Sequence, residues 1–291
     1  MLSNDVIKKI RRIEIATRRI LTGSAIGDSR SIVRGPGFEF DQIREYQIGD
    51  DVRYIDWNSS SRANSLLVKQ YQQERNRTII IAIDVSASSL FCSGDQLKSD
   101  VMAQVAAVFT LAAEYAKDAV SVLLFSDEIE LYIPAGSGRQ HTRLIMEKLF
   151  AYQSKSKKTR IACALDRLMG LGKPDGILFL ISDFIDTTLQ NNKKILSLVA
   201  RKYDFVAVRC LDTNEHALPL AGFITVTDSE TGQTVLVDLR KQSGAASLFL
   251  KNRLQQQEQL FKRNGVALLD IMVDRPFVND VIKFFRKRMM K

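Results

Sequence analysis

The sequence predicts an α/β protein built on an open, mainly parallel β-sheet flanked by helices. The first observation is a run of apolar, mostly β-branched residues that starts at Thr78 and ends at Asp84. A short run that is apolar at successive positions is typical of a strand buried on both faces. The second observation is that such runs alternate with helical patterns, which indicates parallel strands joined by right-handed crossovers.

The remaining elements follow from the same periodicities. Strands are predicted at 119–125, 128–133, 176–182, 204–211 and 266–271, and a turn-rich loop at 134–139. Helices are predicted at 96–117, 142–152, 161–171, 189–202, 244–264 and 276–289.

We expect two parts in the chain. Residues 1–77 form an N-terminal extension, with an amphipathic helix over 1–22 followed by an irregular loop region, and this extension packs on the core. Residues 78–291 form the α/β domain. A β-hairpin is inserted at about 212–240, because stretches of alternating polarity at 223–228 and 233–238 flank a Ser-Glu-Thr-Gly turn.

Composition indicates an ordinary soluble globular protein. The chain has 291 residues, of which 45% are hydrophobic and 26% charged. No stretch approaches the roughly 18 to 20 apolar residues that span a bilayer, and the N-terminus lacks the apolar core of a signal peptide. The three cysteines, Cys92, Cys163 and Cys210, are scattered without disulfide or zinc spacing. We therefore expect a cytoplasmic protein without a transmembrane segment.

The formal net charge of +9 could favour nucleic acid, an anionic membrane surface or an acidic protein partner. The densest basic pieces lie at 8–12, 155–160 and 283–291. Because no RNA-binding aromatic signature or recognition helix accompanies them, nucleic acid is disfavoured. Solvated faces of terminal helices explain these residues most simply, and peripheral membrane contact stays open.

The predicted strand at 78–84 ends in a group of oxygen-bearing side chains, Asp84, Ser86 and Ser88. Ligands of open α/β sheets bind outside the carboxyl ends of the strands. Two hydroxyls and one carboxylate suit Mg²⁺, which prefers oxygen ligands and needs few carboxylates. The competing interpretation is that Asp84 and Ser86 only cap the following turn.

The Asp-x-Ser-x-Ser segment resembles the metal-ion-dependent adhesion site of von Willebrand factor A-type domains. That family adds a Thr from a later loop and an Asp from the end of a later strand, and Thr159 and Asp183 match these positions. The resemblance implies a Rossmann-like von Willebrand factor A fold that binds Mg²⁺, with Mn²⁺ or Ca²⁺ as alternatives. Our hypothesis is that Ser86, Ser88 and Thr159 bind the ion directly, that Asp84 and Asp183 act largely through water, and that a carboxylate of a partner completes the shell.

Motifs outside this segment carry a second resemblance. They are Gly-x-Gly-x-Glu-Phe at 35–40, Arg-Glu-Tyr at 44–46 and Gly-Asp-Asp-x-Arg-x-Ile-Asp-Trp at 49–57. With them the chain resembles the bacterial family called domain of unknown function 58, which carries a von Willebrand factor A-like domain and is typically encoded beside MoxR-type AAA+ ATPases. The resemblance implies an adaptor that works with such an ATPase in chaperone-like assembly or maturation of a client protein.

The charged and aromatic residues of these motifs allow two interpretations. They form either a structural brace, through locally satisfied ion pairs, or a second contact surface for a partner, and we favour the brace. The residues are Arg44, Glu45, Asp50, Asp51, Arg53, Asp56 and Trp57.

The sequence contains few of the motifs that are typical of enzymes. It has two histidines, His141 and His216, and neither a Gly-x-Ser-x-Gly elbow nor an HExxH motif, and residues 136–139 lack the ending of a phosphate-binding loop. We therefore expect a non-catalytic, metal-dependent adaptor. The alternative is an electrostatic binder of anionic membrane surface or nucleic acid through the basic terminal helices, which predicts steep salt dependence and no requirement for magnesium.

Overall fold

The computed structural model describes residues 38–48, 50–63, 65–73, 78–90, 96–156, 158–172, 176–186, 189, 192–212, 223–227 and 234–289. The chain divides into two compact units, Gly27–Arg77 and the rest of the chain, and each is described by itself. The helix expected over residues 1–22 lies outside the described residues.

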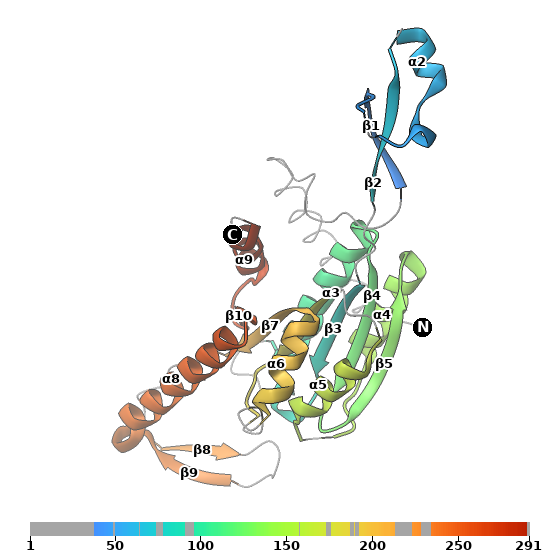
Figure 1. The fold of residues 1–291 in the computed structure, drawn as a ribbon. Helices are drawn as coiled ribbons and strands as arrows, with labels where there is room; N and C mark the ends of the chain where they lie inside the picture. Colours follow the sequence, from blue (N-terminus) through green and yellow to red (C-terminus); the bar gives the residue numbers. More distant parts are fainter. Residues whose placement is uncertain are drawn as a thin grey trace. The chain divides into compact units, whose positions relative to one another are not determined.

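The larger unit is built on a six-stranded sheet (Figure 1). Its strands are β3 (Thr78–Asp84), β4 (Ala119–Phe125), β5 (Ile129–Gly136), β6 (Gly176–Ser182), β7 (Asp204–Leu211) and β10 (Ala267–Met272). Their order is β10-β7-β6-β3-β4-β5, and every pairing is parallel except that of β4 with β5. The predicted fold class, an open and mainly parallel sheet, is confirmed. This is the doubly wound order, and its switch point lies between β3 and β6.

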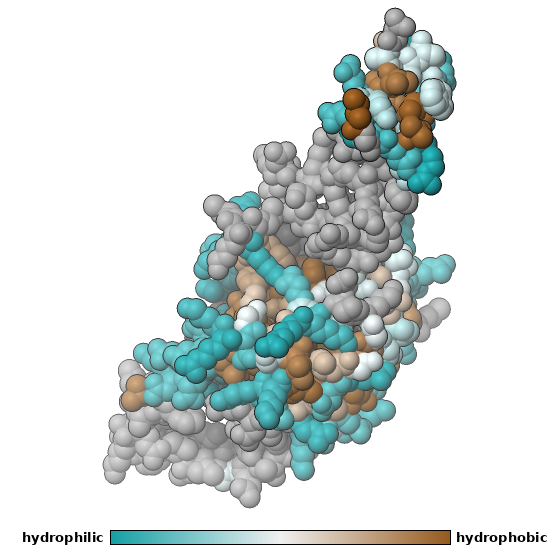
Figure 2. Space-filling model, in the orientation of Figure 1, coloured by the Kyte–Doolittle hydropathy of each residue, from teal (hydrophilic) through white to brown (hydrophobic). Residues whose placement is uncertain are grey.

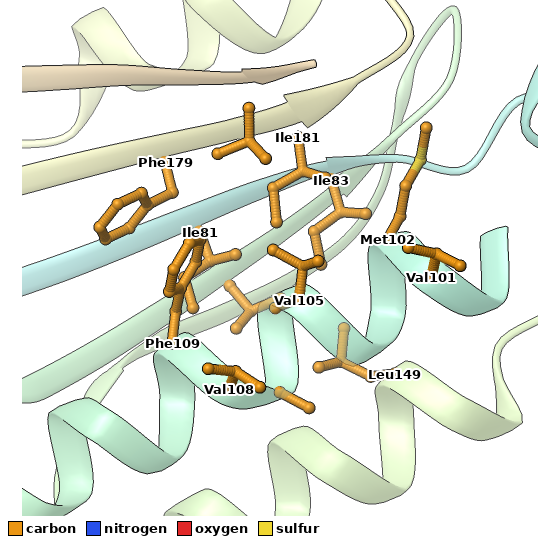
Figure 3. Close-up of a cluster of buried hydrophobic side chains, with 14 of the residues drawn as sticks. Ile81, Ile83, Val101, Met102, Val105, Val108, Phe109, Leu149, Phe179 and Ile181 are labelled. Carbon is orange, nitrogen blue, oxygen red and sulfur yellow. The ribbon is translucent and has the colours of Figure 1, made fainter. Parts of the chain in front are cut away.

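Helices cover both faces of the sheet. One face carries α3 (Lys98–Tyr115), α4 (Arg139–Ala151) and α9 (Val278–Met289), and the other carries α5 (Ile161–Gly170), α6 (Lys193–Lys202) and α8 (Leu239–Arg263). Alternation along β3 fills both layers. Ile81 and Ile83 pack in the layer of α3 (Figure 3), whereas Ile80 and Ala82 pack in the layer of α5 and α6. Within the described part of the chain, no helix is both long and apolar enough to cross a membrane.

The inserted hairpin is confirmed. It consists of β8 (Phe223–Thr227) and β9 (Thr234–Asp238), which pair in antiparallel fashion, and α8 begins at Leu239, directly after β9. The helix thus starts five positions earlier than the periodicity indicated.

The predicted loop at 134–139 is wrong in its first half. Strand β5 continues through Pro134 and Ala135 to Gly136. Because β5 is an edge strand, a proline there need not remove a ladder hydrogen bond. Helix α4 then begins at Arg139.

The smaller unit is more regular than expected. Residues predicted as an irregular loop form an antiparallel pair, β1 (Phe38–Glu45) and β2 (Leu67–Gln73), connected through the 3₁₀ helix η1 (Val52–Tyr54) and helix α2 (Trp57–Ala63). The register shifts between Phe40 and Gln42. Such a bulge moves the apolar alternation from even to odd positions, so no single period-2 pattern runs through β1.

Candidate functional site

Two neighbouring parallel strands bring their polar ends together at the switch point of the sheet. Asp84 is the last residue of β3 and Ser182 the last residue of β6, and the register pairs Ile83 with Ile181 immediately before them. The Ser182 hydroxyl donates a hydrogen bond of 2.8 Å to Asp84 Oδ2, and both side chains are buried.

The loop after β3 folds back on the Asp84 carboxylate. The Ser86 amide donates to Asp84 Oδ1 at 3.0 Å, and the 3₁₀ helix η2 (Ala87–Leu90) follows. The hydroxyl oxygens of Ser86 and Ser88 lie 3.0 Å apart, and Ser89 Oγ donates to the Ser86 carbonyl at 2.6 Å. Asp84 therefore caps this turn, as one interpretation held, and the same turn places the two predicted hydroxyls beside each other.

Asp183, directly after β6, is the second buried carboxylate. Its Oδ1 accepts from the Ile185 amide at 3.1 Å, and its Oδ2 accepts from Lys98 Nζ at 3.3 Å. Lys98 is the first residue of α3, and the side chains of this ion pair are 0% and 1% exposed. A lysine ammonium therefore lies within the group of residues that the sequence predicted as a cation site.

Thr159 lies in the segment that precedes α5, and its hydroxyl is buried. Two hydrogen bonds fix this segment. The Arg160 amide donates to the Ser126 carbonyl after β4 at 3.0 Å, and the Ile161 amide donates to Asp186 Oδ2 after β6 at 2.8 Å. Since β4 and β6 flank β3, Thr159 belongs to the same carboxyl edge of the sheet as Asp84.

Burial governs the electrostatics of Asp84. The pKa of Asp84 is raised from 3.8 to about 7, mainly because the group is removed from water and secondly because Asp183 is negatively charged. The hydrogen bonds from Ser86 and Ser182 act in the opposite direction and lower it. The edge of the sheet thus holds a carboxyl group whose ionised form is disfavoured unless a positive charge compensates it.

A second network, buried except at Asp270, holds the segment after Asp183. Gln257 on α8 donates to the Phe184 carbonyl at 2.6 Å, and its Oε1 accepts from Arg209 Nη1 at 2.9 Å. Arg209 on β7 also makes a two-pronged ion pair with Asp270 on β10, at 2.7 and 2.9 Å. Phe184 has a φ of 54°, in the left-handed region that is costly for a bulky residue. Helix α8 therefore fixes the chain next to the Asp183 carboxylate.

The donor set fits a hard divalent cation. Among the residues that the structure describes, no group of three or more His, Cys, Asp or Glu side chains is placed to hold a metal, so a metal site here depends on hydroxyl oxygens. Each of the four carboxylate oxygens of Asp84 and Asp183 already accepts a hydrogen bond from the chain. Hydroxyls and partly satisfied carboxylates suit Mg²⁺, which retains several waters.

The predicted brace residues lie in the smaller unit and pair locally. Arg44 holds Asp50 through two hydrogen bonds of 2.7 Å and also donates to the Glu45 carbonyl. Arg53 pairs with Asp51, which also accepts from the Arg53 amide. These contacts are the kind of local network expected for a brace, and the apolar side chains of Ile48 and Val52 beside them are exposed.

The remaining two brace residues behave differently from each other. Asp56 caps α2 by accepting from the Asn58 and Ser59 amides, and it pairs with Lys69 at 3.4 Å. Trp57 is 67% exposed. Figure 2 shows hydrophobic residues among hydrophilic ones on the surface of this unit. The geometry of this unit is therefore compatible with a brace and with a contact surface.

Three residues of this region, Lys98, Ser182 and Gln257, were not predicted from the sequence. Ser182 had a signal, since it ends an apolar strand next to a predicted ligand. Lys98 and Gln257 had none, because each lies in a helical pattern where a polar residue is usually solvated.

Two mycobacterial proteins are similar to the chain in sequence. The uncharacterized protein Rv1480 of Mycobacterium tuberculosis is 26% identical over 283 residues, which cover 96% of this chain and 88% of that protein. The uncharacterized protein MAV169 of Mycobacterium avium is 24% identical over 160 residues, which cover 54% of this chain and 93% of that protein.

Solved structures resemble it less closely. An aerotolerance-related membrane protein from Bacteroides fragilis has a TM-score of 0.49 at 13% identity, over 72% of this chain and 97% of that one. The conserved hypothetical protein BatB from Bacteroides thetaiotaomicron has a TM-score of 0.42 at 11% identity, over 74% and 100%. Both scores are below 0.5, so the fold is assigned from the strand order of the sheet itself.

The match to a protein family covers most of the chain. The family model matches residues 42–258, which run from β1 in the smaller unit to α8 in the larger unit. The chain therefore belongs to the family described as protein of unknown function DUF58.

Proposed function

We propose that this protein is a non-catalytic, metal-dependent adaptor for protein–protein interaction. The observation that carries the proposal is the convergence of Asp84, Ser86, Ser88 and Asp183 on the carboxyl edge of the sheet, at its switch point. In open α/β sheets this is the place where ligands bind.

The residues would act as follows. Ser86, Ser88 and Thr159 supply neutral oxygen ligands, and Asp84 and Asp183 supply the negative charge. When bound, Mg²⁺ would offer an open coordination position to a carboxylate of the partner. The turn that holds Ser86 and Ser88 beside each other is already closed by the Ser86 amide and the Ser89 hydroxyl, so both hydroxyl oxygens are held next to each other before any ligand binds.

The same geometry argues against a catalytic role for the carboxylates. A general base must reach the proton that it removes. Asp84 and Asp183 are buried, and their oxygens are engaged by the amides of Ser86 and Ile185, the Ser182 hydroxyl and the Lys98 ammonium. We therefore assign them to charge balance and positioning.

The partner that we propose is a MoxR-type AAA+ ATPase, and the adaptor would hold the ATPase, a client protein, or both in the cytoplasm. This choice rests on the family to which the chain belongs, because the resemblance described above implies a protein that is typically encoded beside a MoxR-type AAA+ ATPase.

The experiment is a binding assay between the purified protein and the MoxR-type ATPase encoded in the same genome, in Mg²⁺ and in EDTA. The test variant is Asp84→Asn, which removes one charge but keeps an oxygen to accept the Ser86 amide. Asp166→Asn, at an exposed position of α5, is the matched control. We expect binding by the wild type and the control in Mg²⁺ alone, and at least about tenfold weaker binding by Asp84→Asn.

Equal binding by all three proteins in Mg²⁺ and in EDTA would overturn the proposal. Steep weakening with added NaCl, without any effect of EDTA, would favour the electrostatic alternative. That alternative would use the basic last turn of α9, in which Arg288 is already paired with Asp204.

A further inference from the structure

Lys98 is a fixed positive charge inside the candidate metal site. Its side chain is 0% exposed, and its ammonium lies 3.3 Å from Asp183 Oδ2. Because side chains on a helix tilt toward its N-terminus, Lys98 at the start of α3 points to the carboxyl edge of the sheet, where β3 and β6 end.

Two costs accompany this placement. A buried ammonium loses its hydration, and an attraction to one carboxylate rarely repays that loss in full. The N-terminal end of α3 carries the positive end of the helix dipole, which disfavours a cation there. An apolar side chain of similar length would fill the same space but would leave the buried Asp183 carboxylate without a compensating charge, so the role of Lys98 is electrostatic and not one of packing.

We propose that Lys98 is a tethered cation that competes with the divalent metal for Asp183, so that metal binds weakly until a carboxylate of the partner joins the site. The inference rests on the proposed function, because it assigns a role to Lys98 within the same metal site. It makes Lys98 a positioning residue that sets metal affinity and couples it to partner binding.

The argument is one of charge balance. With both carboxylates ionised, Asp84, Asp183 and Lys98 together carry one negative charge, and a divalent ion would leave the site with one positive charge. Excess charge in a buried region is unfavourable because the local dielectric constant is low. A carboxylate from the partner would return the site to neutrality. Metal and partner should therefore bind cooperatively, and each should raise the affinity of the other by the same factor.

The test compares Mg²⁺ affinity, measured by isothermal titration calorimetry, for the wild type, Lys98→Met and Lys98→Gln. Lys148→Met, which removes an exposed lysine from α4, is the matched control for net charge. We expect Mg²⁺ to bind both Lys98 variants at least about tenfold more tightly than the wild type or the control. Acetate serves as the carboxylate probe. It should strengthen Mg²⁺ binding to the wild type, and it should have a smaller effect on Lys98→Gln.

The unfolding temperature, measured in EDTA and in Mg²⁺, is a second readout that remains usable if a variant folds poorly without metal. Removing Lys98 leaves the buried Asp183 uncompensated, so both variants should unfold at lower temperature than the wild type in EDTA. Mg²⁺ should raise their unfolding temperature more than that of the wild type. Failure of Mg²⁺ to restore either variant would count against the inference as directly as unchanged affinity.

The outcomes separate the inference from the proposed function. If the wild type and both Lys98 variants bind Mg²⁺ with equal affinity, the metal site stands and the role of Lys98 is overturned. If none of the proteins binds Mg²⁺, with or without acetate, the metal site itself is wrong and the proposed function fails with it.

Discussion

Charged residues occur in pairs at the carboxyl edge of the sheet and in the smaller unit, called here the β1–β2 unit, but the two regions differ in burial. In the β1–β2 unit, the side chains of Arg53 and Asp51 are 82% and 36% exposed. At the edge of the sheet, those of Lys98 and Asp183 are 0% and 1% exposed. Distances alone do not distinguish the two, since the exposed pair is the closer one, at 2.6 Å against 3.3 Å.

The difference teaches that burial, more than geometry, decides what an ion pair can do. Water screens an exposed pair, so the pair orders its loop without much effect on stability. A buried pair has paid its desolvation, and breaking it by removing one partner typically costs about 3–5 kcal/mol. Charges at the sheet edge are therefore sensitive to any ligand that alters the local balance, whereas those in the β1–β2 unit are not.

The largest expected effect concerns the pH dependence of stability at Asp84. Its pKa is raised from 3.8 to about 7 in the folded protein. Below pH 3.8 both states hold the proton, and between the two values only the folded state keeps it. Stability should therefore fall as pH rises through this window and level off above about pH 7, by on the order of 4 kcal/mol in total. Urea unfolding in EDTA at successive pH values measures this.

Asp84→Asn isolates the contribution of this one group. The amide does not titrate, so the difference in unfolding free energy between variant and wild type should grow in favour of the variant by about 1.4 kcal/mol per pH unit within the window. Asp166→Asn, at an exposed position, should follow the wild-type curve. Parallel curves for Asp84→Asn and the wild type would show that Asp84 is not held in a disfavoured ionised state.

A smaller effect is expected at Gln257. Its replacement by Leu leaves the Phe184 carbonyl and Arg209 Nη1 each without one hydrogen-bond partner. Unsatisfied buried polar groups cost about 1–3 kcal/mol, and we expect a loss in this range from urea unfolding. Gln255→Leu, on the exposed side of α8, is the matched control and should be close to neutral. A loss equal to that of the control would mean that α8 does not stabilise the segment after Asp183.

The fold was predictable from sequence where local pattern and burial agree. Strands β4, β6 and β7 have the bounds that their apolar runs predicted, because each is buried along nearly its whole length. The edge strand β5 and the bulged strand β1 were missed or shortened, because one contains Pro134 and the other shifts its alternation after Phe40.

The candidate site was predictable only in part, for a related reason. Asp84, Ser86 and Ser88 belong to one turn, so their spacing alone brings them together. Lys98 reaches Asp183 across 85 residues, and Gln257 reaches Phe184 across 73. Nothing local marks such residues, since only the packing of α3 and α8 on the sheet turns an ordinary helical polar residue into a buried one.

The smallest effect is expected at Asp51, which tests whether the exposed ion pair of the β1–β2 unit contributes to stability. Asp51→Asn removes the ion pair with Arg53 but keeps an oxygen to accept the Arg53 amide at the start of η1. The Arg53 side chain lowers the pKa of Asp51 through its hydrogen bonds, yet solvent surrounds both groups. We therefore expect no measurable change in the urea midpoint between wild type and Asp51→Asn, at low or at high NaCl. A clear loss that vanishes at high NaCl would show that this exposed pair does stabilise the β1–β2 unit, and burial would then no longer separate the two regions.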